Sequence, residues 1–184
     1  MTSLRMLLVM TLVCGLMYPL AITGVAQILF PHQANGSLIV RNGRVLGSEL
    51  IGRSLEDPRY FWPRPSATPE FPYNGSASAG SNLSPKSPVL RHMVEDRRRS
   101  LLASDPGNRK PIPTDLLTAS GSGLDPHISP EAALWQVNRV ARFRGLDPEQ
   151  VAALVKQHVQ PRQFGVLGEP RVNVLILNLR LDER

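Results

Sequence analysis

The segment TASGSGLDPHISPEAA, residues 118–133, is the part of the chain whose residue types most resemble a catalytic or phosphate-binding loop. A phosphate-binding P-loop requires a lysine after its second glycine, and no lysine follows here. A dinucleotide-binding fingerprint requires a third glycine where Pro126 stands. A nucleophile elbow requires glycines two residues before and after its serine, and neither Ser120 nor Ser122 has both. The residues therefore exclude all three patterns.

An ordered loop that ends in the start of a helix explains the same segment. Ser129 is expected to cap the helix, with Pro130 as its first residue and Glu131 complementing the helix dipole. His127 is expected to bond nearby backbone rather than to act as a base. These residues predict a structural loop and not an active site.

The four histidines do not form a metal site, because they are scattered singly without the short spacings of zinc ligands. His158 falls on the apolar face of a predicted helix and is interpreted as a core histidine. The chain is expected to hold no metal and no cofactor of its own.

The formal net charge of +6 does not indicate a nucleic-acid partner. The only run of three basic residues, Arg97 to Arg99, has no stacking aromatic residues interleaved with it. A solvated helix face explains this run. The single cysteine, Cys14, lies in the apolar N-terminus, so the remainder of the chain has no disulfide.

An uncharged stretch of 25 residues, Met6 to Phe30, predicts a membrane-spanning helix after a tail of residues 1–5. As a helix it would reach roughly 37 Å at 1.5 Å per residue. That length exceeds a hydrocarbon core of about 30 Å. A cleaved signal peptide is the alternative, since Gly24 and Ala26 could mark a small-x-small cleavage site.

The orientation of this span depends on few charges. Arg5 precedes the span, whereas Arg41 and Arg44 follow it, which is weakly against an outside domain. A long C-terminal domain can cross the membrane regardless of its charge, and a short N-terminal tail usually stays inside. We therefore expect a cytoplasmic N-terminus and a periplasmic domain, residues 31–184.

This domain is expected to have an α+β fold with a small sheet, about three helices and many loops. Asn42-Gly43 predicts a hairpin turn, and residues 57–87, with six prolines, predict a long ordered loop. Helices are expected to begin at Pro88, Pro130 and Pro148. The second should bury Ala133, Leu134, Val137, Val140 and Ala141. The segment Arg171 to Leu181 is predicted to be a strand.

Four long segments carry a resemblance to a known family. They are YFWPRPSAT (60–68), YNGSASAGSNLSP (73–85), IPTDLLTASGSGLDPHISPEAA (112–133) and LGEPRVNVLILNL (167–179). In these segments, and in its single N-terminal span, the chain resembles the C subunit of the bacterial Kdp-type potassium-transporting ATPase. Pro63, Ala79 and Ser84 depart from it, because they stand where glycines are common.

The resemblance implies a single-pass subunit of a bacterial inner-membrane complex, the Kdp complex, which hydrolyses ATP to import potassium at high affinity. The implied partners are a channel-like potassium-translocating subunit, a P-type ATP-hydrolysing subunit and a small single-span subunit, with membrane lipid around the span. The complex would use ATP and potassium. The family's C subunit is described as needed for assembly and as a chaperone-like factor that raises the ATP affinity of the pump subunit.

The sequence motifs agree with a non-catalytic role in such a complex. The chain has no Asp-Lys-Thr-Gly motif for phosphorylation and no potassium selectivity-filter sequence. Two alternatives stay open. One is a secreted or membrane-anchored periplasmic binding protein independent of the pump, with a mature N-terminus near Gln27 if it is cleaved. The other is a membrane-attached hydrolase that uses His127 with Ser120 or Ser122.

The 60–85 and 118–131 loops are the predicted contacts with the channel-like subunit, because they are rich in backbone and aromatic groups but lack catalytic ones. The candidate contact residues are Tyr60, Phe61, Arg64, Pro65, Ser66, Tyr73, Asn74, Gly80, Ser81, Asn82, Ser120, Gly121, Ser122, Gly123, Asp125, His127, Glu169 and Arg171.

Overall fold

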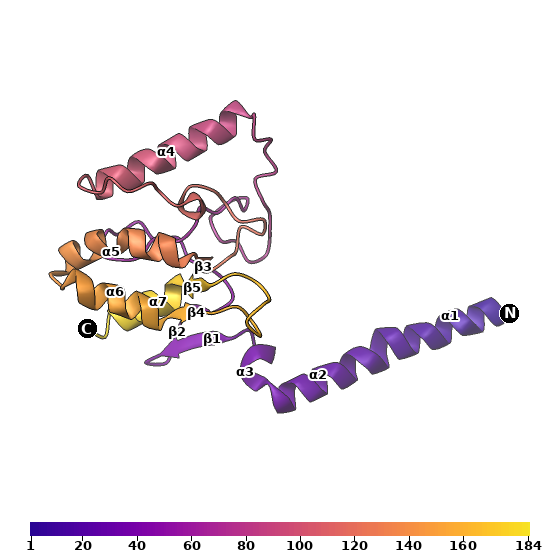
Figure 1. Cartoon of the computed structure of the whole chain (residues 1–184). Helices are drawn as coiled ribbons and strands as arrows, with labels where there is room; N and C mark the ends of the chain where they lie inside the picture. Colours follow the sequence, from indigo (N-terminus) through magenta and orange to yellow (C-terminus); the bar gives the residue numbers. More distant parts are fainter. The chain divides into compact units, whose positions relative to one another are not determined.

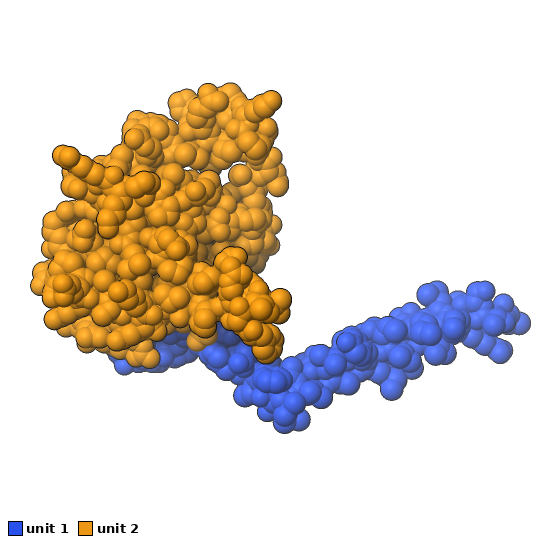
Figure 2. All heavy atoms as spheres, in the orientation of Figure 1, with its two compact units in different colours: residues 1–48 blue, residues 49–184 orange.

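The computed structural model describes residues 1–184, which form two compact units, residues 1–48 and residues 49–184 (Figure 2). The first unit consists of an apolar helix and a β-hairpin, and the second holds the remaining helices and a small sheet. The α+β class expected from the sequence is confirmed.

The first unit begins with one continuous helix made of α1 (Thr2–Leu12), a π-helical turn η1 (Val13–Met17) and α2 (Tyr18–Leu29) (Figure 1). The π-helical turn lies just before Pro19, which has no N–H to donate, and Tyr18 N donates there to the carbonyl of Val13. The helix has 28 residues, and its most apolar window has a mean hydropathy of 2.1 with no residue buried. By length and composition it could cross a membrane.

The hairpin of the first unit follows a short helical turn, α3 (Pro31–Ala34), and pairs β1 (Leu38–Arg41) with β2 (Arg44–Ser48). The strands are antiparallel, with Arg41 opposite Arg44. The two turn residues both have positive φ, 52° at Asn42 and 73° at Gly43. This is the backbone that an Asn-Gly pair favours, so the predicted hairpin is confirmed.

The second unit opens with the proline-rich loop and α4 (Pro88–Ser104). Residues 52–87 contain no helix or strand, as predicted, but the loop is well anchored. The side chains of Phe61, Trp62 and Tyr73 are buried with 0, 5 and 8% exposed. In α4 only Leu101 is buried. The predicted solvated face is right for Arg98 and Arg99, which are exposed, but wrong for Arg97, which is half-buried because its guanidinium donates to the carbonyls of Leu116 and Pro63.

The other helices begin where the sequence predicts. In α5 (Pro130–Arg144), Ser129 Oγ accepts the N–H of Ala132 at 3.0 Å, and Gly145 ends the helix in the left-handed conformation. In α6 (Pro148–Gln157), Asp147 caps the helix by accepting the N–H of Glu149 at 3.0 Å. The remaining elements are the 3₁₀ turn η2 (Thr114–Leu116), β3 (His127–Ile128), β4 (Val159–Gln160), β5 (Arg171–Asn173) and α7 (Val174–Leu181).

Three short antiparallel strands form the sheet of the second unit in the order β3-β5-β4. Helix α5 packs on α6, and α6 packs on α7, so that the three helices gather beside this sheet (Figure 1). The core lies between them and includes Val140, Val155, Val172 and Leu177, each 0% exposed. The loop residues Phe61 and Trp62 belong to the same core.

The predicted strand Arg171 to Leu181 is wrong beyond Asn173. The structure turns at this residue into helix α7, whose first turn is capped by Asn173 Oδ1, an acceptor for the N–H of Ile176 at 3.1 Å. Leu175, Leu177 and Leu181 are all buried in this helix. Because nearly every position of the segment is apolar, its sequence is compatible with a buried strand as well as with a buried helix.

The predicted apolar stripe of α5 is wrong at one position and incomplete at others. Leu134 is 39% exposed, whereas Gln136 and Arg139 on the same helix are completely buried. Both polar side chains form hydrogen bonds with the loop that contains Phe61 and Trp62. A sequence pattern that scores polar residues as solvent-facing cannot identify such positions.

Candidate functional site

The YFWPRP segment is held in place by two buried amides that pair with its backbone as a neighbouring strand would. Gln136 Oε1 accepts the N–H of Trp62 at 2.7 Å, and Gln136 Nε2 donates to the Trp62 carbonyl at 3.1 Å. Asn178 does the same for Phe61, with both bonds at 2.9 Å. Both residues of the loop therefore have their buried peptide groups satisfied from helices α5 and α7.

Two arginines lie against the indole ring of Trp62. The guanidinium carbon of Arg139 is 4.4 Å from the centre of the indole ring, and that of Arg97 is 5.4 Å from it. Burial lowers the pKa of Arg139 to about 10, and the group stays charged at neutral pH. Arg139 also donates to the carbonyl of Pro58, and Arg97 donates to that of Pro63, so both cations fasten the loop.

Arg64 joins this segment to the loop before α5. Its guanidinium donates to the carbonyls of Thr118 and Ala119 at 3.4 and 3.3 Å and lies 3.4 Å from a carboxylate oxygen of Asp125. The backbone carbonyl of Arg64 accepts the hydroxyl of Tyr73 at 2.6 Å. Burial raises the pKa of Tyr73, which keeps this phenol protonated as a donor.

A second set of bonds connects the two predicted contact loops directly. Ser66 Oγ donates to the carbonyl of Gly123 at 2.7 Å, and the carbonyl of Ser122 accepts the N–H of Ala79 and the hydroxyl of Ser78, both at 3.0 Å. Ser66 Oγ also accepts the N–H of Tyr73 at 2.9 Å. The loops are thus one interlocked structure.

This interlocking explains two of the glycines. A Cβ on Gly123, whose φ is 69°, would meet the carbonyl oxygen of Ala79 at 2.5 Å and Thr68 Cγ2 at 2.7 Å. A Cβ on Gly80 would meet the carbonyl oxygen of Gly121 at 2.9 Å. The backbones of the two loops approach too closely for a side chain at either position.

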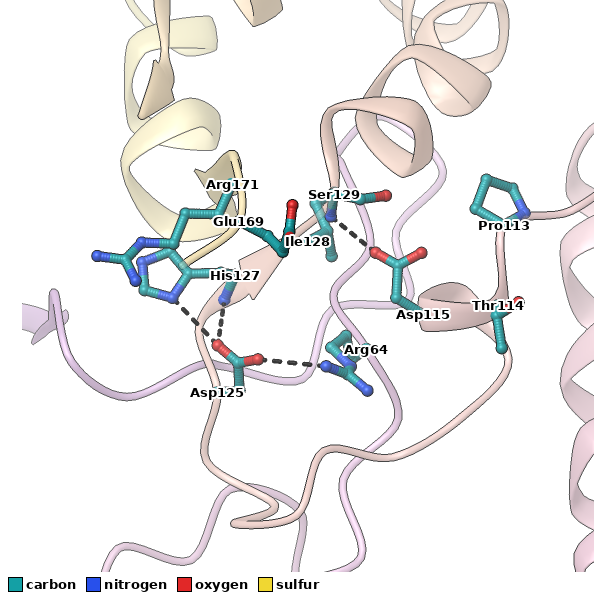
Figure 3. A pocket seen from close by; sticks show the side chains of 10 residues that line it. All are labelled: Arg64, Pro113, Thr114, Asp115, Asp125, His127, Ile128, Ser129, Glu169 and Arg171. Carbon is teal, nitrogen blue, oxygen red and sulfur yellow. Dashed lines mark hydrogen bonds and ion pairs between the residues drawn. The ribbon is translucent and has the colours of Figure 1, made fainter. Parts of the chain in front are cut away.

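An open depression of about 540 Å³ lies beside these loops (Figure 3). The charged residues that line it are Arg64, Asp115, Asp125, Glu169 and Arg171, and His127 lies among them. They come from the proline-rich loop, the segment from η2 to β3, and the chain at the start of β5. With both signs represented, the depression suits a mixed polar surface rather than a site for a single strong anion or cation.

Asp125 is the charged centre of the depression (Figure 3). Its Oδ1 accepts the N–H of His127 at 3.0 Å and lies 3.1 Å from His127 Nδ1. Burial opposes ionisation of Asp125, but hydrogen bonds from His127 and the charge of Arg64 outweigh it and lower the pKa of this carboxyl. The expectation that the His127 side chain bonds to backbone is wrong, because its ring partner is this carboxylate.

Neither candidate serine contacts the histidine. Ser120 Oγ accepts the N–H of Gly123 at 2.9 Å, and Ser122 Oγ accepts the N–H of Leu124 at 3.1 Å. The two hydroxyls face each other at 3.4 Å. Their hydrogen bonds shape the turn, whereas a catalytic pair requires a bond between serine and base.

The other candidate residues divide by exposure. The Tyr60 hydroxyl donates to Asp182 at 3.3 Å, and the guanidinium carbon of Arg144 lies 4.6 Å from the centre of the Tyr60 ring. His158, which is outside these loops, is half-buried, and its Nδ1 bonds to the Leu154 carbonyl at 2.8 Å. Exposed candidates are Asn82, Gly121, Ser122, Glu169 and Arg171; half-buried ones are Tyr60, Arg64, Pro65, Ser66, Gly80, Ser81, Asp125 and His127; buried ones are Phe61, Tyr73, Asn74, Ser120 and Gly123.

The residues that position the loops from outside were missed by sequence reasoning. Gln136 and Arg139 share the face of α5 that contains Ala132 and Val140, so their spacing placed them toward the core. That helical spacing was the available signal. Asn178 lies in a segment predicted to be a strand, and the alternation expected of a strand does not show that its amide reaches the loop.

Comparison with known proteins shows the family to which the chain belongs. The family model of the K⁺-transporting ATPase c chain, KdpC, matches residues 1–183. A potassium-transporting ATPase KdpC subunit of Methylococcus capsulatus is 59% identical over 98% of this chain and 95% of its own length. The KdpC subunits of Dechloromonas aromatica and Variovorax paradoxus are 56 and 61% identical, covering 98 and 91% of this chain and 94 and 87% of their own lengths. The chain belongs to the KdpC family, the c chains of potassium-transporting ATPases, which confirms the resemblance found in its motifs.

Proposed function

We propose that this chain is a non-catalytic subunit of a high-affinity, ATP-driven potassium import complex and that it stabilises the assembled complex. The observation that supports this most is that Ser120, Ser122 and His127 form their hydrogen bonds within their own loop. All three shape the loop around Asp125 and not a reaction centre. What the loops offer instead is a rigid polar surface with a depression. Such a surface is suited to a protein partner.

In this proposal the helix Thr2–Leu29 anchors the chain in the bacterial inner membrane, with the N-terminus in the cytoplasm and residues 31–184 as the periplasmic domain. The partners are a channel-like potassium-translocating subunit, a P-type ATP-hydrolysing subunit and a small single-span subunit. The domain docks on the outer face of the channel-like subunit through its interlocked loops, where it would help to shape the potassium entrance.

The same subunit would raise the ATP affinity of the ATP-hydrolysing subunit, as a chaperone-like factor. A periplasmic domain cannot touch cytoplasmic ATP, so this effect would be long-range coupling through the membrane spans. The depression supports no direct nucleotide site, since Asp115, Asp125 and Glu169 oppose the phosphates there.

Co-purification tests the assembly role. The chain is tagged after Arg184, expressed with its neighbouring transport subunits and extracted in mild detergent. We expect a P-type ATPase and a large channel-like protein to co-purify, together with potassium-stimulated ATPase activity. A chain that emerges alone, folded and stable contradicts the proposal and favours an independent binding protein.

Cysteine labelling tests the orientation. Cys14 is replaced by serine, and Ser100, an exposed residue of α4, is replaced by cysteine. A membrane-impermeant maleimide should then label Ser100→Cys in intact spheroplasts. Labelling that appears only after lysis would place the domain in the cytoplasm. The Cys14→Ser chain without a new cysteine gives the background.

A further inference from the structure

The segment between β4 and β5 carries an exposed apolar tip, which we define as residues 163–167. Phe164 is 85% exposed, Val166 71% and Leu167 57%. The whole segment 161–170 is exposed, so nothing in the second unit covers these three side chains. Single exposed apolar residues are ordinary, but three at one turn form a patch.

Hydrogen bonds fix the conformation of the tip. Gln163 and Leu167 exchange both backbone bonds, at 2.8 and 2.9 Å, and the N–H of Val166 donates to Gln163 at 3.2 Å. Two of the three turn residues have positive φ, 54° at Phe164 and 78° at Gly165. Glycine adopts this conformation freely, but an aromatic residue there is strained. The fold thus maintains a strained phenylalanine with its ring in water.

The base of the tip is polar and adjoins the depression. Arg162 pairs with Glu169 at 2.5 Å, and Arg171 Nε donates to Gln160 at 3.1 Å. Glu169 and Arg171 also line the depression that contains Asp125 (Figure 3). The apolar tip and the polar depression therefore form a continuous surface. An apolar anchor beside a polar rim is the usual anatomy of a protein interface.

We propose that the tip is an apolar anchor of the subunit interface and inserts into an apolar pocket on the channel-like subunit, beside the interlocked loops. The depression beside it then lies at the polar rim, with Arg171 facing an acidic or carbonyl group of that subunit. This inference rests on the proposed function, because it requires the chain to assemble with protein partners. It adds an apolar anchor beside the interlocked loops, whose polar groups bond largely to one another.

A protein pocket fits the tip better than a lipid surface does. The turn is already rigid, which favours a pocket of definite shape because little freedom is lost on binding. A segment that binds anionic lipid carries clustered unpaired basic residues. Here Glu169 neutralises Arg162 directly below the apolar side chains. Charge and rigidity together favour a protein partner.

Paired substitutions in the full chain test the inference within the co-purification described above. Phe164→Ser with Val166→Ser removes most of the exposed apolar surface of the tip. The matched control is Phe143→Ser with Val89→Ser, since these residues are 46 and 57% exposed on helices α5 and α4, outside the interlocked loops. We expect the tip variant to retain about tenfold less of the partner subunits than wild type. The control should retain as much as wild type.

A photoreactive benzoylphenylalanine at position 164, and at 143 as its control, gives a second measurement in the assembled complex. It keeps an aromatic ring, so its result does not depend on the serine variants. We expect position 164, and not 143, to crosslink to the channel-like subunit.

Retention by the tip variant at the wild-type level would overturn the inference while leaving the proposed function intact. Adducts of position 164 with lipid alone would have the same effect, because they would place the tip in the bilayer. A wild-type chain that brings no subunit with it would overturn the proposed function itself, and the inference with it.

Discussion

Two side-chain amides in this protein perform a task that β-sheets normally give to backbone. Gln136 and Asn178 each donate to and accept from one loop residue, Trp62 and Phe61 respectively. Because these peptide groups are buried, they have no water to bond if the amide is lost. The geometry of the YFWPRP segment therefore depends on single residues far away in the sequence.

Gln136→Ala should destabilise the second unit markedly. The substitution leaves both peptide groups of Trp62 unsatisfied and removes a partner of Arg139. We expect a loss of about 3 kcal/mol in the free energy of unfolding, measured by chemical denaturation of the detergent-solubilised chain. Asn138→Ala, an exposed site on the same helix, should change it by less than about 0.5 kcal/mol. Equal effects at the two sites would contradict the role of the buried amide.

Asp125→Asn tests the charge in the depression through its pH dependence. The pKa of Asp125 in the folded chain lies below the ordinary value of 3.8, so the unfolded chain binds the proton more tightly. The stabilisation by the carboxylate is thus complete above that value and is lost as the pH falls through the folded-state pKa. We expect the variant to melt at a lower temperature than wild type at pH 7, and the difference to shrink below pH 3.8. A difference that is constant with pH would contradict a charge effect.

At the scale of elements, the two motif-bearing loops stabilise each other through close backbone approach. Gly123→Ala should be severely destabilising, because its Cβ would lie 2.5 Å from the Ala79 carbonyl and φ is 69°. Gly121→Ala is the matched control, since its Cβ would meet nothing within 4 Å and its φ is not positive. We expect a loss of at least about 2 kcal/mol in the free energy of unfolding for the first and less than about 1 kcal/mol for the second. Tolerance of Gly123→Ala would show that the loops do not pack closely in solution.

Local signals predicted the elements of this fold that depend on local chemistry. Asn42-Gly43 specifies its turn through positive φ, and Ser129 with Pro130 specifies the start of α5 through a cap and a missing N–H. Arg171 to Leu181 failed because its apolar residues match a buried strand as well as a buried helix. The decisive residue there is Asn173, whose side chain caps α7 and donates to the carbonyl of Glu49 at 2.8 Å.

The candidate site could be predicted only in part, because its geometry is made between loops distant in sequence. The motifs identified Arg64, Asp125 and His127, which the structure brings together in the depression. No sequence pattern shows that Arg64 reaches the carbonyls of residues 118 and 119, which are more than fifty positions away. The apolar tip at Phe164 was also missed, since one phenylalanine among prolines and glycines gives no periodic pattern.

At the scale of the whole molecule, the chain combines two units of different chemistry. Residues 1–48 contain the apolar helix, and residues 49–184 contain the interlocked loops, the depression and the apolar tip. If the first unit anchors and the second docks, each contributes to binding of the same partners. Linkage of two attachments in one chain raises the effective concentration of each at its site. The apolar tip can then be small and still hold the domain in place.

Reciprocity gives the sharpest test of how such a subunit could raise ATP affinity from the opposite side of the membrane. Any factor by which the chain tightens ATP binding must equal the factor by which ATP tightens binding of the chain, because both follow from the same coupling free energy. A fluorophore on Ser100→Cys, in the Cys14→Ser background, reports the dissociation constant of the chain from the complex. We expect a non-hydrolysable ATP analogue to lower this constant by the factor measured for ATP affinity with and without the chain. A change in ATP affinity with no matching change in the dissociation constant would exclude equilibrium coupling. The effect would then have to arise in the kinetics of the pump cycle.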